Sequence, residues 1–460
     1  MQREEKKLAG KRVAFLTLGC KVNSYETEGM RELLLNAGAV EAEFEEEADI
    51  YVVNTCSVTN MADRKSRQML HRAKKKNPFA LIVAAGCYVQ AAGEELAAKE
   101  GIDLIVGNNQ KAHIADLIED ALEHRGKASC ALLEIGKEKE YEELSIEAVT
   151  ERTRAYIKIE DGCNQFCSYC IIPYVRGRVR SRGEEEILEE ITRLAKNGYK
   201  EVVLTGIHLS SYGLSKFDDA LANAEDSSKT VLPLLALLKK VQEISGIERI
   251  RLGSLEPRIM TESFVRELAS LSKICPHFHL SLQSGCDATL KRMNRKYTTK
   301  EYLSAVEILR KYFDRPAITT DIIVGFPGET GEEFSESLRF AERVAFSQIH
   351  IFKYSRRAGT VADRMAGQVP EPVKSERSDA LEQVERSLRD AYVAQFFGAE
   401  ESVLLEEEVD WDGKSYMVGH TTRYVKVYVA KTGSVPCANE TVKVQVSDTR
   451  IGDGVLAEAR

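Results

Sequence analysis

The stretch Gly162-Cys163-Asn164-Gln165-Phe166-Cys167-Ser168-Tyr169-Cys170 places three cysteines in one short loop, with three and then two residues between them. Three thiolates at this spacing can bind three irons of a cubane [4Fe–4S] cluster and leave the fourth iron open to a small molecule. S-adenosylmethionine (SAM) can chelate such an iron and be cleaved reductively to a carbon radical. The alternative is a structural zinc loop, which normally uses four ligands in paired CxxC spacing, and no fourth Cys or His lies nearby in the sequence. We therefore predict that Cys163, Cys167 and Cys170 hold a catalytic iron–sulfur cluster.

Composition indicates a large globular protein. A chain of 460 residues suggests about three domains, and 43% hydrophobic with 30% charged residues is ordinary for such a protein. The charged start, residues 1–7, lacks the apolar run of a signal peptide, and we find no apolar run of about 18 residues that would span a membrane. We expect a cytoplasmic protein. Because the net charge is −8, nucleic-acid binding would need local basic patches.

The first part of the chain predicts a parallel α/β sheet. Apolar segments alternate with helical patterns and are predicted as strands: residues 11–21, 49–56, 80–87 and 104–108. The first three end at Cys20, Cys56 and Cys87. In open α/β sheets, ligands bind beyond the carboxyl ends of the strands. We therefore expect these cysteines to converge on a second cluster or metal, the alternative being three unrelated buried thiols.

Two further patterns in the sequence have more ordinary interpretations. Four isolated cysteines are interpreted as small buried hydrophobic residues: Cys130, Cys275, Cys286 and Cys437. The segment from Arg64 to Lys76 is basic and contains no acidic residue. It is either a solvated helix face or a surface for phosphate groups.

The middle of the chain, after a charged linker at about residues 124–150, predicts a partial (β/α)6 barrel. Its strands are predicted at residues 155–159, 201–206, 250–254, 277–283, 318–326 and 349–352. Functional loops of such barrels follow the carboxyl ends of the strands. Candidates for binding SAM are therefore Tyr169 of the cysteine loop and the strand-end residues Thr205, Gly206, Ser254, Glu256 and Gln283. The alternative for each strand-end residue is a purely structural role in its loop.

The end of the chain changes character. A long helix is predicted at about residues 374–397, and short strands follow at residues 403–405, 424–429 and 440–446. These predict a small antiparallel β-barrel, a shape that often holds single-stranded nucleic acid. A barrel that only packs or dimerises is the alternative. The predicted domains are residues 11–124, 151–385 and 399–460.

The motifs, taken in order, resemble those of the radical-SAM methylthiotransferases. They are Gly19-Cys20-Lys21-Val22-Asn23, Asn54-Thr55-Cys56, Gly86-Cys87, the segment from Gly162 to Tyr174, Arg176-Gly177-Arg178, Ser281-Leu282-Gln283-Ser284-Gly285 and the segment from Asp321 to Thr330. The resemblance covers nearly the whole chain. It implies an N-terminal α/β domain with an auxiliary cluster, a central radical-SAM barrel and a C-terminal RNA-binding barrel called TRAM.

Within that family, Gly19-Cys20-Lys21-Val22-Asn23 is similar to the branch that modifies N6-threonylcarbamoyladenosine at position 37 of tRNA. The other branches act on N6-isopentenyladenosine or on a ribosomal-protein aspartate. The resemblance implies replacement of the C2 hydrogen of adenine by a methylthio group, with two SAM molecules and two [4Fe–4S] clusters. Cys163, Cys167 and Cys170 would hold the cluster that generates a 5′-deoxyadenosyl radical, and Cys20, Cys56 and Cys87 the one that carries sulfur. A departure is Thr205-Gly206-Ile207-His208, which lacks the acid of the usual Gly-Gly-Glu motif.

The implied partners are a tRNA anticodon stem-loop, an electron donor such as flavodoxin or ferredoxin, and a sulfur source. Alternating arginines after the cysteine loop are predicted to face phosphates, with a solvated charged edge as the alternative: Arg176, Arg178, Arg180 and Arg182. The competing class is a non-catalytic iron–sulfur or zinc protein that binds RNA. It would bind tRNA without cleaving SAM.

Overall fold

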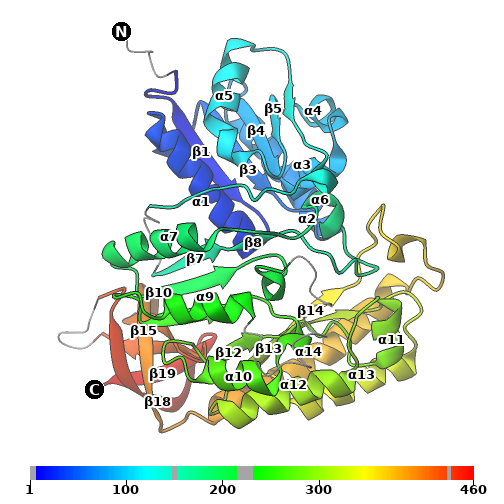
Figure 1. Cartoon of the computed structure of the whole chain (residues 1–460), viewed down its shortest axis with the longest axis vertical. Helices are drawn as coiled ribbons and strands as arrows, with labels where there is room; N and C mark the ends of the chain where they lie inside the picture. Colours follow the sequence, from blue (N-terminus) through cyan, green and yellow to red (C-terminus); the bar gives the residue numbers. More distant parts are fainter. Residues whose placement is uncertain (1–6, 148–152, 215–231, 432–436) are drawn as a thin grey trace.

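The computed structural model describes residues 7–147, 153–214, 232–431 and 437–460. Figure 1 shows a parallel α/β unit at the N-terminal end, a larger α/β unit in the centre and a small β-barrel at the C-terminal end. This arrangement confirms the predicted fold class. The domain boundaries stay a prediction, and residues 148–150 of the predicted linker lie outside the described ranges. Within those ranges, no helix combines the length and the apolar character needed to cross a membrane.

The N-terminal sheet has, in the described part of the chain, six parallel strands in the order β2-β1-β3-β4-β5-β6. The strands are β1 (Arg12–Thr17), β2 (Val40–Ala42), β3 (Ile50–Thr55), β4 (Leu81–Gly86), β5 (Leu104–Val106) and β6 (Ser129–Ala131). The helices are α1 (Lys21–Asn36), α2 (Asn60–Lys76), α3 (Cys87–Ala92), α4 (Glu95–Glu100) and α5 (Ile114–Glu123). Strands β3 and β4 are buried along their whole length, because apolar clusters cover both faces of the sheet. The sequence pattern does not predict β2 and β6, since three residues show no periodicity, and β6 lies within the predicted linker.

The central unit is an open half-barrel. Two three-stranded parallel sheets are joined by isolated bridges between Ile250 and Ile274 and between Leu255 and Leu280. The strands are β7 (Arg154–Lys158), β10 (Glu201–Thr205), β11 (Arg249–Leu252), β12 (His277–His279), β13 (Ala317–Val324) and β14 (Gln348–Lys353). The main helices are α7 (Glu184–Lys196), α9 (Pro233–Val241), α10 (Glu262–Ala269), α12 (Thr299–Tyr312), α13 (Gly331–Val344) and α14 (Glu371–Ala394). Two short helices, α6 (Ile172–Val175) and α11 (Asp287–Arg292), and the short pair β8 (Glu160–Asp161) and β9 (Arg180–Ser181) complete it.

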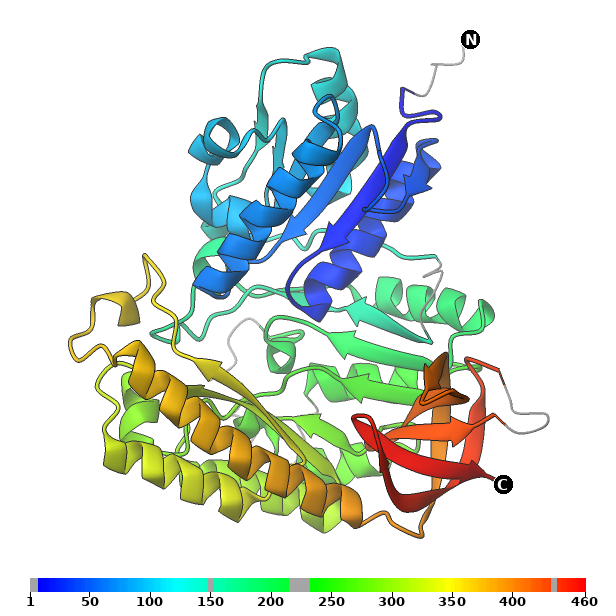
Figure 2. The same cartoon turned by 180° about the vertical axis from the view of Figure 1, so that it is seen from behind.

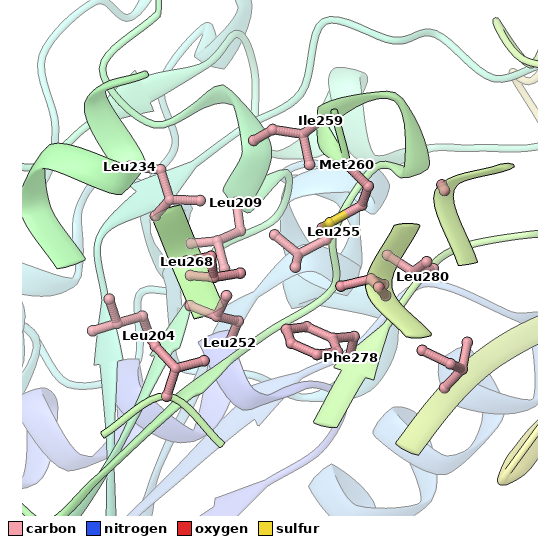
Figure 3. Packing of buried hydrophobic residues seen from close by; sticks show 14 of the residues in the cluster. Leu204, Leu209, Leu234, Leu252, Leu255, Ile259, Met260, Leu268, Phe278 and Leu280 are labelled. Atoms are coloured by element: carbon pink, nitrogen blue, oxygen red, sulfur yellow. The ribbon is translucent and has the colours of Figure 1, made fainter. Parts of the chain in front are cut away.

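The two faces of the half-barrel differ in polarity. Leu204, Leu252 and Phe278 point to the helices and form part of the largest apolar core (Figure 3). Successive strand residues point to opposite faces, so the residues between the core positions lie on the other side. We call this side the open face; its residues include Arg154, Tyr156, Lys158, Glu201, Thr205, Arg249, Arg251, His277, His279, Asp321 and His350. The open face is thus strongly polar, as expected for a face that receives a ligand.

The C-terminal unit is a closed barrel in the order β15-β16-β17-β19-β18. Its strands are β15 (Glu400–Trp411), β16 (Lys414–Thr421), β17 (Lys426–Ala430), β18 (Thr441–Ile451) and β19 (Gly454–Ala459). The predicted antiparallel barrel is present, although β17 and β19 pair in parallel to close it. Figure 2 shows α14 running along the half-barrel toward this barrel.

Arginines of the central sheet dock the barrel. Arg249 donates to the carbonyl oxygens of His420 and Ser402, and Arg251 donates to those of Thr421 and Thr422, at 2.8 to 3.0 Å. These guanidinium groups give the barrel carbonyls charged hydrogen-bond donors at the contact between the two units.

Of the four isolated cysteines, two are buried as predicted and two are not. Cys275 and Cys286 are buried, whereas Cys130 and Cys437 are exposed. The interpretation as buried residues is therefore wrong for these two. Cys130 lies on the edge strand β6, whose three residues are all partly or fully exposed.

Candidate active site

The cysteine loop, residues 162–170, follows β8 and is fixed by its backbone. Gly162 has a φ of +83°, and a Cβ at this position would lie 2.0 Å from the carbonyl oxygen of Arg178, so no other residue fits. The Ser168 amide donates to the Met293 carbonyl at 3.0 Å, and its hydroxyl donates to the Arg292 carbonyl at 2.8 Å. The segment after α11 thus holds the loop in place.

The three thiols of this loop face one another. Burial, together with the neighbouring Cys167, raises the pKa of Cys170 to about 12. Burial also raises the pKa of Cys163 well above its usual range, with contributions from Cys170 and Cys167. Metal ligation requires thiolates, and a bound iron would supply the positive charge that stabilises them at Cys163 and Cys170. The donor set therefore fits an iron–sulfur cluster.

An arginine missed by sequence reasoning contacts the same loop. Nη1 of Arg295 lies 3.2 Å from Sγ of Cys167 and donates a hydrogen bond to it. Nε of Arg295 donates to the Tyr297 hydroxyl at 2.9 Å. Arg295 lies more than a hundred residues after the loop, so spacing gives no signal for it.

The N-terminal cysteines, Cys20, Cys56 and Cys87, follow the neighbouring strands β1, β3 and β4. A Cβ on Gly19 would lie 3.0 Å from Sγ of Cys56, so Cys56 packs directly against the residue before Cys20. Burial, with contributions from both Cys87 and Cys20, raises the pKa of Cys56 to about 11. The structure therefore brings these three residues together, as expected from the parallel sheet.

The two cysteine groups also lie next to each other. Cys87 packs against Ile171 and Val175, in the segment directly after Cys170. The Cys87 side chain is near enough to contribute to the raised pKa of Cys170, for which burial is the main cause. The carboxyl ends of the first sheet thus face the cysteine loop of the half-barrel.

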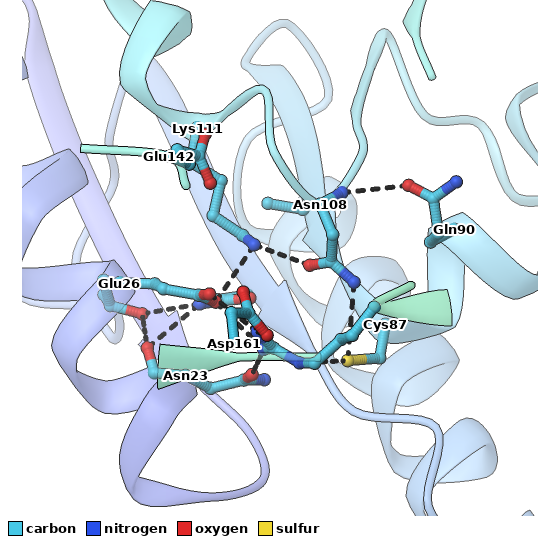
Figure 4. Close-up of polar contacts among 12 residues, drawn as sticks. Asn23, Glu26, Cys87, Gln90, Asn108, Lys111, Glu142 and Asp161 are labelled. Atoms are coloured by element: carbon cyan, nitrogen blue, oxygen red, sulfur yellow. Dashed lines mark hydrogen bonds and ion pairs between the residues drawn. The ribbon is translucent and has the colours of Figure 1, made fainter. Parts of the chain in front are cut away.

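A buried ionic network joins the two units beside Cys87 (Figure 4). Arg176 is fully buried and donates to Glu26 Oε1 at 2.8 Å and to Asp161 Oδ1 at 3.0 Å. Its Nε lies 3.3 Å from Sγ of Cys87. Lys158 Nζ lies 2.8 Å from Glu26 Oε1. Burial alone would favour neutral acids, but the cations Arg176 and Lys158 hold the pKa of Asp161 well below its usual range.

Asn108 and Lys111 extend this network. Nδ2 of Asn108 lies 3.7 Å from Sγ of Cys87, and its Oδ1 accepts a hydrogen bond from Lys111 Nζ at 2.6 Å. Lys111 Nζ also lies 3.0 Å from Glu26 Oε2. Cys87 therefore receives hydrogen bonds from both units, and one of the two donors is the Arg176 cation.

The strand-end candidates for SAM lie at one end of the half-barrel but differ in exposure. Thr205, Glu256 and Gln283 are buried, whereas Ser254 is exposed. Glu256 Oε1 accepts a hydrogen bond from Arg258 Nε at 2.6 Å. Despite burial, a hydrogen bond from His208 and the charge of Arg295 lower the pKa of Glu256 to about 2.

Glu160 is a further buried acid at this end that the sequence did not single out. Its Oε2 accepts a hydrogen bond from the His208 amide at 2.7 Å, whereas Oε1 is buried without a hydrogen-bond partner. A Cβ on Gly206 would lie 2.6 Å from Oε2. Burial raises the pKa of Glu160 to about 8. The site thus offers a buried carboxyl group with an unpaired oxygen, and a cationic ligand would stabilise its ionised form.

The arginines after the cysteine loop do not form one exposed row, so that prediction is wrong: Arg176, Arg180 and Arg182 are buried. Gly177, with a φ of +75°, turns the backbone, and β9 is only two residues long, so strand alternation is not maintained. Of the four, Arg178 is exposed. Its guanidinium lies 4.4 Å from the centre of the Phe166 ring.

The basic segment after the second strand forms α2. Lys74 and Lys76 pair with Asp103 and Glu45, as expected for a solvated helix face. Three of its other basic residues are exposed: Arg64, Lys65 and Lys75. A role in phosphate binding stays a prediction.

Two family models match the chain. The Radical SAM superfamily model matches residues 157–341, and the model described as Uncharacterized protein family UPF0004 matches residues 12–107. Among solved structures, a radical S-adenosylmethionine methyltransferase, TsrM, from Kitasatospora setae aligns with a TM-score of 0.54 over 77% of each chain, at 13% sequence identity. This likeness shows the shared fold.

Curated relatives match nearly the whole chain. It is 40% identical over 435 residues to the threonylcarbamoyladenosine tRNA methylthiotransferase MtaB of Bacillus subtilis, covering 94% of this chain and 93% of that protein. It is 38% identical over 417 residues to the MtaB protein of Thermotoga maritima, covering 90% and 91%. It is also 35% identical over 449 residues to the tRNA-2-methylthio-N(6)-dimethylallyladenosine synthase of Thermodesulfovibrio yellowstonii, covering 96% and 97%.

Proposed function

This chain belongs to the radical SAM tRNA methylthiotransferase family, and we propose that it converts N6-threonylcarbamoyladenosine at position 37 of tRNA to its 2-methylthio derivative. Relatives named for threonylcarbamoyladenosine are 35 to 40% identical to this chain, and relatives named for dimethylallyladenosine are 34 to 38% identical. The choice of substrate is supported by the two relatives at 40%, both of which are named for threonylcarbamoyladenosine. The observation that carries the proposal is the meeting of two groups of three cysteines at one junction.

We propose that each group holds one [4Fe–4S] cluster: Cys163, Cys167 and Cys170 the first, and Cys20, Cys56 and Cys87 the second. Three protein ligands leave one iron of each cluster open. When bound, the clusters and two SAM molecules supply the carbon radical, the inserted sulfur and the methyl group. The C2 hydrogen of adenine is neither acidic nor hydridic, so side-chain acid–base chemistry alone would not remove it.

Side chains around the cysteines have identifiable roles in this proposal. Arg295 donates to Cys167 Sγ, and Arg176 and Asn108 donate to Cys87 Sγ. Hydrogen bonds to ligand sulfurs help to set the reduction potential of an iron–sulfur cluster. These residues thus tune and orient the two sites from the protein side.

The SAM pocket is proposed at the strand ends next to the cysteine loop. It comprises Tyr169, Thr205, Gly206, Ser254, Glu256 and Gln283. The unsatisfied Oε1 of Glu160 supports adding this residue as the acceptor for the SAM ammonium. It would replace the acid that the Gly-Gly-Glu motif usually provides and that this chain lacks after Gly206.

The proposed RNA partner is the tRNA anticodon stem-loop, whose unpaired bases can be splayed out and stacked on protein. Arg178 stacks on Phe166 at the exposed edge of the cysteine loop, and the exposed basic residues of α2 add positive charge. We propose that the C-terminal barrel is a TRAM domain that contributes to RNA binding. A reductant such as flavodoxin or ferredoxin and a sulfur source complete the reaction, in the cytoplasm.

Mass spectrometry of nucleosides tests the function directly. We expect tRNA from a strain that lacks this gene to contain threonylcarbamoyladenosine without its methylthio form, and restoration of the gene to produce that form. A gene carrying Cys163→Ser should not restore it. Gain of methylthio on isopentenyladenosine would overturn the substrate assignment. No change in either nucleoside would favour a protein substrate or a binding role instead.

A further inference from the structure

Lys21 reaches over the open face of the half-barrel from the N-terminal unit. It follows Cys20 and is the first residue of α1, a helix that contacts β7 (Figure 1). Its Nζ lies 6.0 Å from the centre of the Tyr156 ring on β7. Burial is the main reason that the pKa values of His277 and His350 are lowered, but the Lys21 charge adds to both shifts. The Lys21 ammonium therefore lies near Tyr156 on β7 and contributes to the electrostatic environment of His350 on β14.

The acids of the open face have cationic partners within the protein, whereas Lys21 contacts an aromatic ring and no described acid. Their contacts are Glu201 Oε1 with Arg154 Nε and Arg251 Nε, both at 2.8 Å, and Asp321 Oδ2 with His279 Nε2 at 3.3 Å. Among the residues that the structure describes, no carboxylate lies within ion-pair distance of Lys21. Lys21 thus presents an ammonium group without a carboxylate partner beside this face, where a small anion would be favourable.

The substrate of the proposed function brings such an anion. Threonylcarbamoyladenosine carries on N6 a threonyl group that ends in a carboxylate, whereas a dimethylallyl group is uncharged. The adenine must approach the N-terminal cysteines for sulfur transfer, and Lys21 adjoins Cys20. An N6 substituent of that adenine can therefore extend over the open face.

We propose that Lys21 binds the threonyl carboxylate of the substrate and so distinguishes this nucleoside from adenosines with an uncharged N6 group. The proposal rests on the proposed function and adds its specificity-determining residue. A charge-assisted hydrogen bond between ammonium and carboxylate is about 2.8 Å long and stronger than one between neutral groups. The arginines of the open face are committed to Glu201 and to barrel carbonyls, and Lys158 pairs with Glu26 and Asp161. Within the described ranges, Lys21 is therefore a cation of this face that remains available to a ligand.

Binding of matched RNAs tests this without turnover. Three anticodon stem-loops would differ only at position 37: threonylcarbamoyladenosine, the same nucleoside with its carboxylate converted to a carboxamide, and adenosine. We expect the wild-type holoenzyme to bind the carboxylate RNA about tenfold more tightly than the carboxamide RNA. Lys21→Met should lose this preference, and Lys21→Arg should retain most of it. The control is Lys196→Met, an exposed lysine on α7 on the helical side of the sheet, which should behave like the wild type.

The ratio of the affinities of two RNAs for one variant does not change if that variant is partly misfolded or has lost part of its clusters. If Lys21→Met still prefers the carboxylate RNA tenfold, the inference is wrong. It is also wrong if Lys21→Met weakens binding of all three RNAs equally, because that result would indicate a contact between Lys21 and a phosphate. If the wild type does not distinguish threonylcarbamoyladenosine from adenosine at all, the proposed function itself fails. If it distinguishes those two but not the carboxamide, only the role of Lys21 fails.

Discussion

At the scale of single residues, the site is defined by buried charges that are balanced across two units. Arg176 contacts Glu26 and Asp161 as well as Cys87. Removing one partner of a buried ion pair costs about 3–5 kcal/mol, because the other charge is left uncompensated. This network therefore aligns Cys87 with the cysteine loop as well as stabilising the junction.

Glu160 gives a prediction about pH. Burial raises its folded-state pKa to about 8, above an unfolded value of about 4.3. The folded protein keeps the proton that the unfolded chain has lost, so the contribution of this group to stability is full below about pH 4.3 and is lost as the pH rises toward 8. The variant Glu160→Gln should therefore melt above the wild type without SAM, with a difference that grows by roughly 5 °C between pH 5 and pH 8. A difference that is constant over this range in calorimetry would contradict the assignment.

At the scale of elements, the cysteine loop depends on one glycine. In Gly162→Ala the new Cβ would lie 2.0 Å from the Arg178 carbonyl oxygen, at a φ of +83°, and the strained backbone alone costs about 1–3 kcal/mol. We expect the variant to lose about half of its iron. The control is Gly136→Ala, where no atom lies within 4 Å of the new Cβ. Equal iron in both variants would show that the loop tolerates a side chain.

The sequence predicts helices and strands well where the hydrophobic pattern is long, and poorly where the chain turns or a strand has only two or three residues. The strands that carry Cys20, Cys56 and Cys87 are predicted from their apolar runs, and their order in the sheet explains the convergence. The arginines after the loop mislead because Gly177 and the two-residue strand β9 break the alternation. The edge strands β2 and β6 are too short to show a pattern.

At the scale of the whole molecule, the site exists only because two α/β units and a barrel pack together. Arg176 and Glu26 are 150 residues apart in sequence, and Arg154 and Glu406 are 252 apart. Neither contact has a local signal in the sequence. These charged side chains are buried or partly buried between units, and no pattern in the sequence marks them as buried. The cysteines could therefore be predicted from the sequence, whereas the surrounding network could not.

The measurement that tests the central claim most directly is iron and acid-labile sulfide content, with Mössbauer spectra, for two triple variants. Wild type should contain about eight irons as two [4Fe–4S] clusters. Changing Cys163, Cys167 and Cys170 to Ser should leave about four, and changing Cys20, Cys56 and Cys87 to Ser should leave the other four. The controls are Cys130→Ser and Cys437→Ser, at exposed cysteines, and both should keep the full iron content of the wild type. Full iron content after loss of the N-terminal cysteines would contradict the account of two facing clusters.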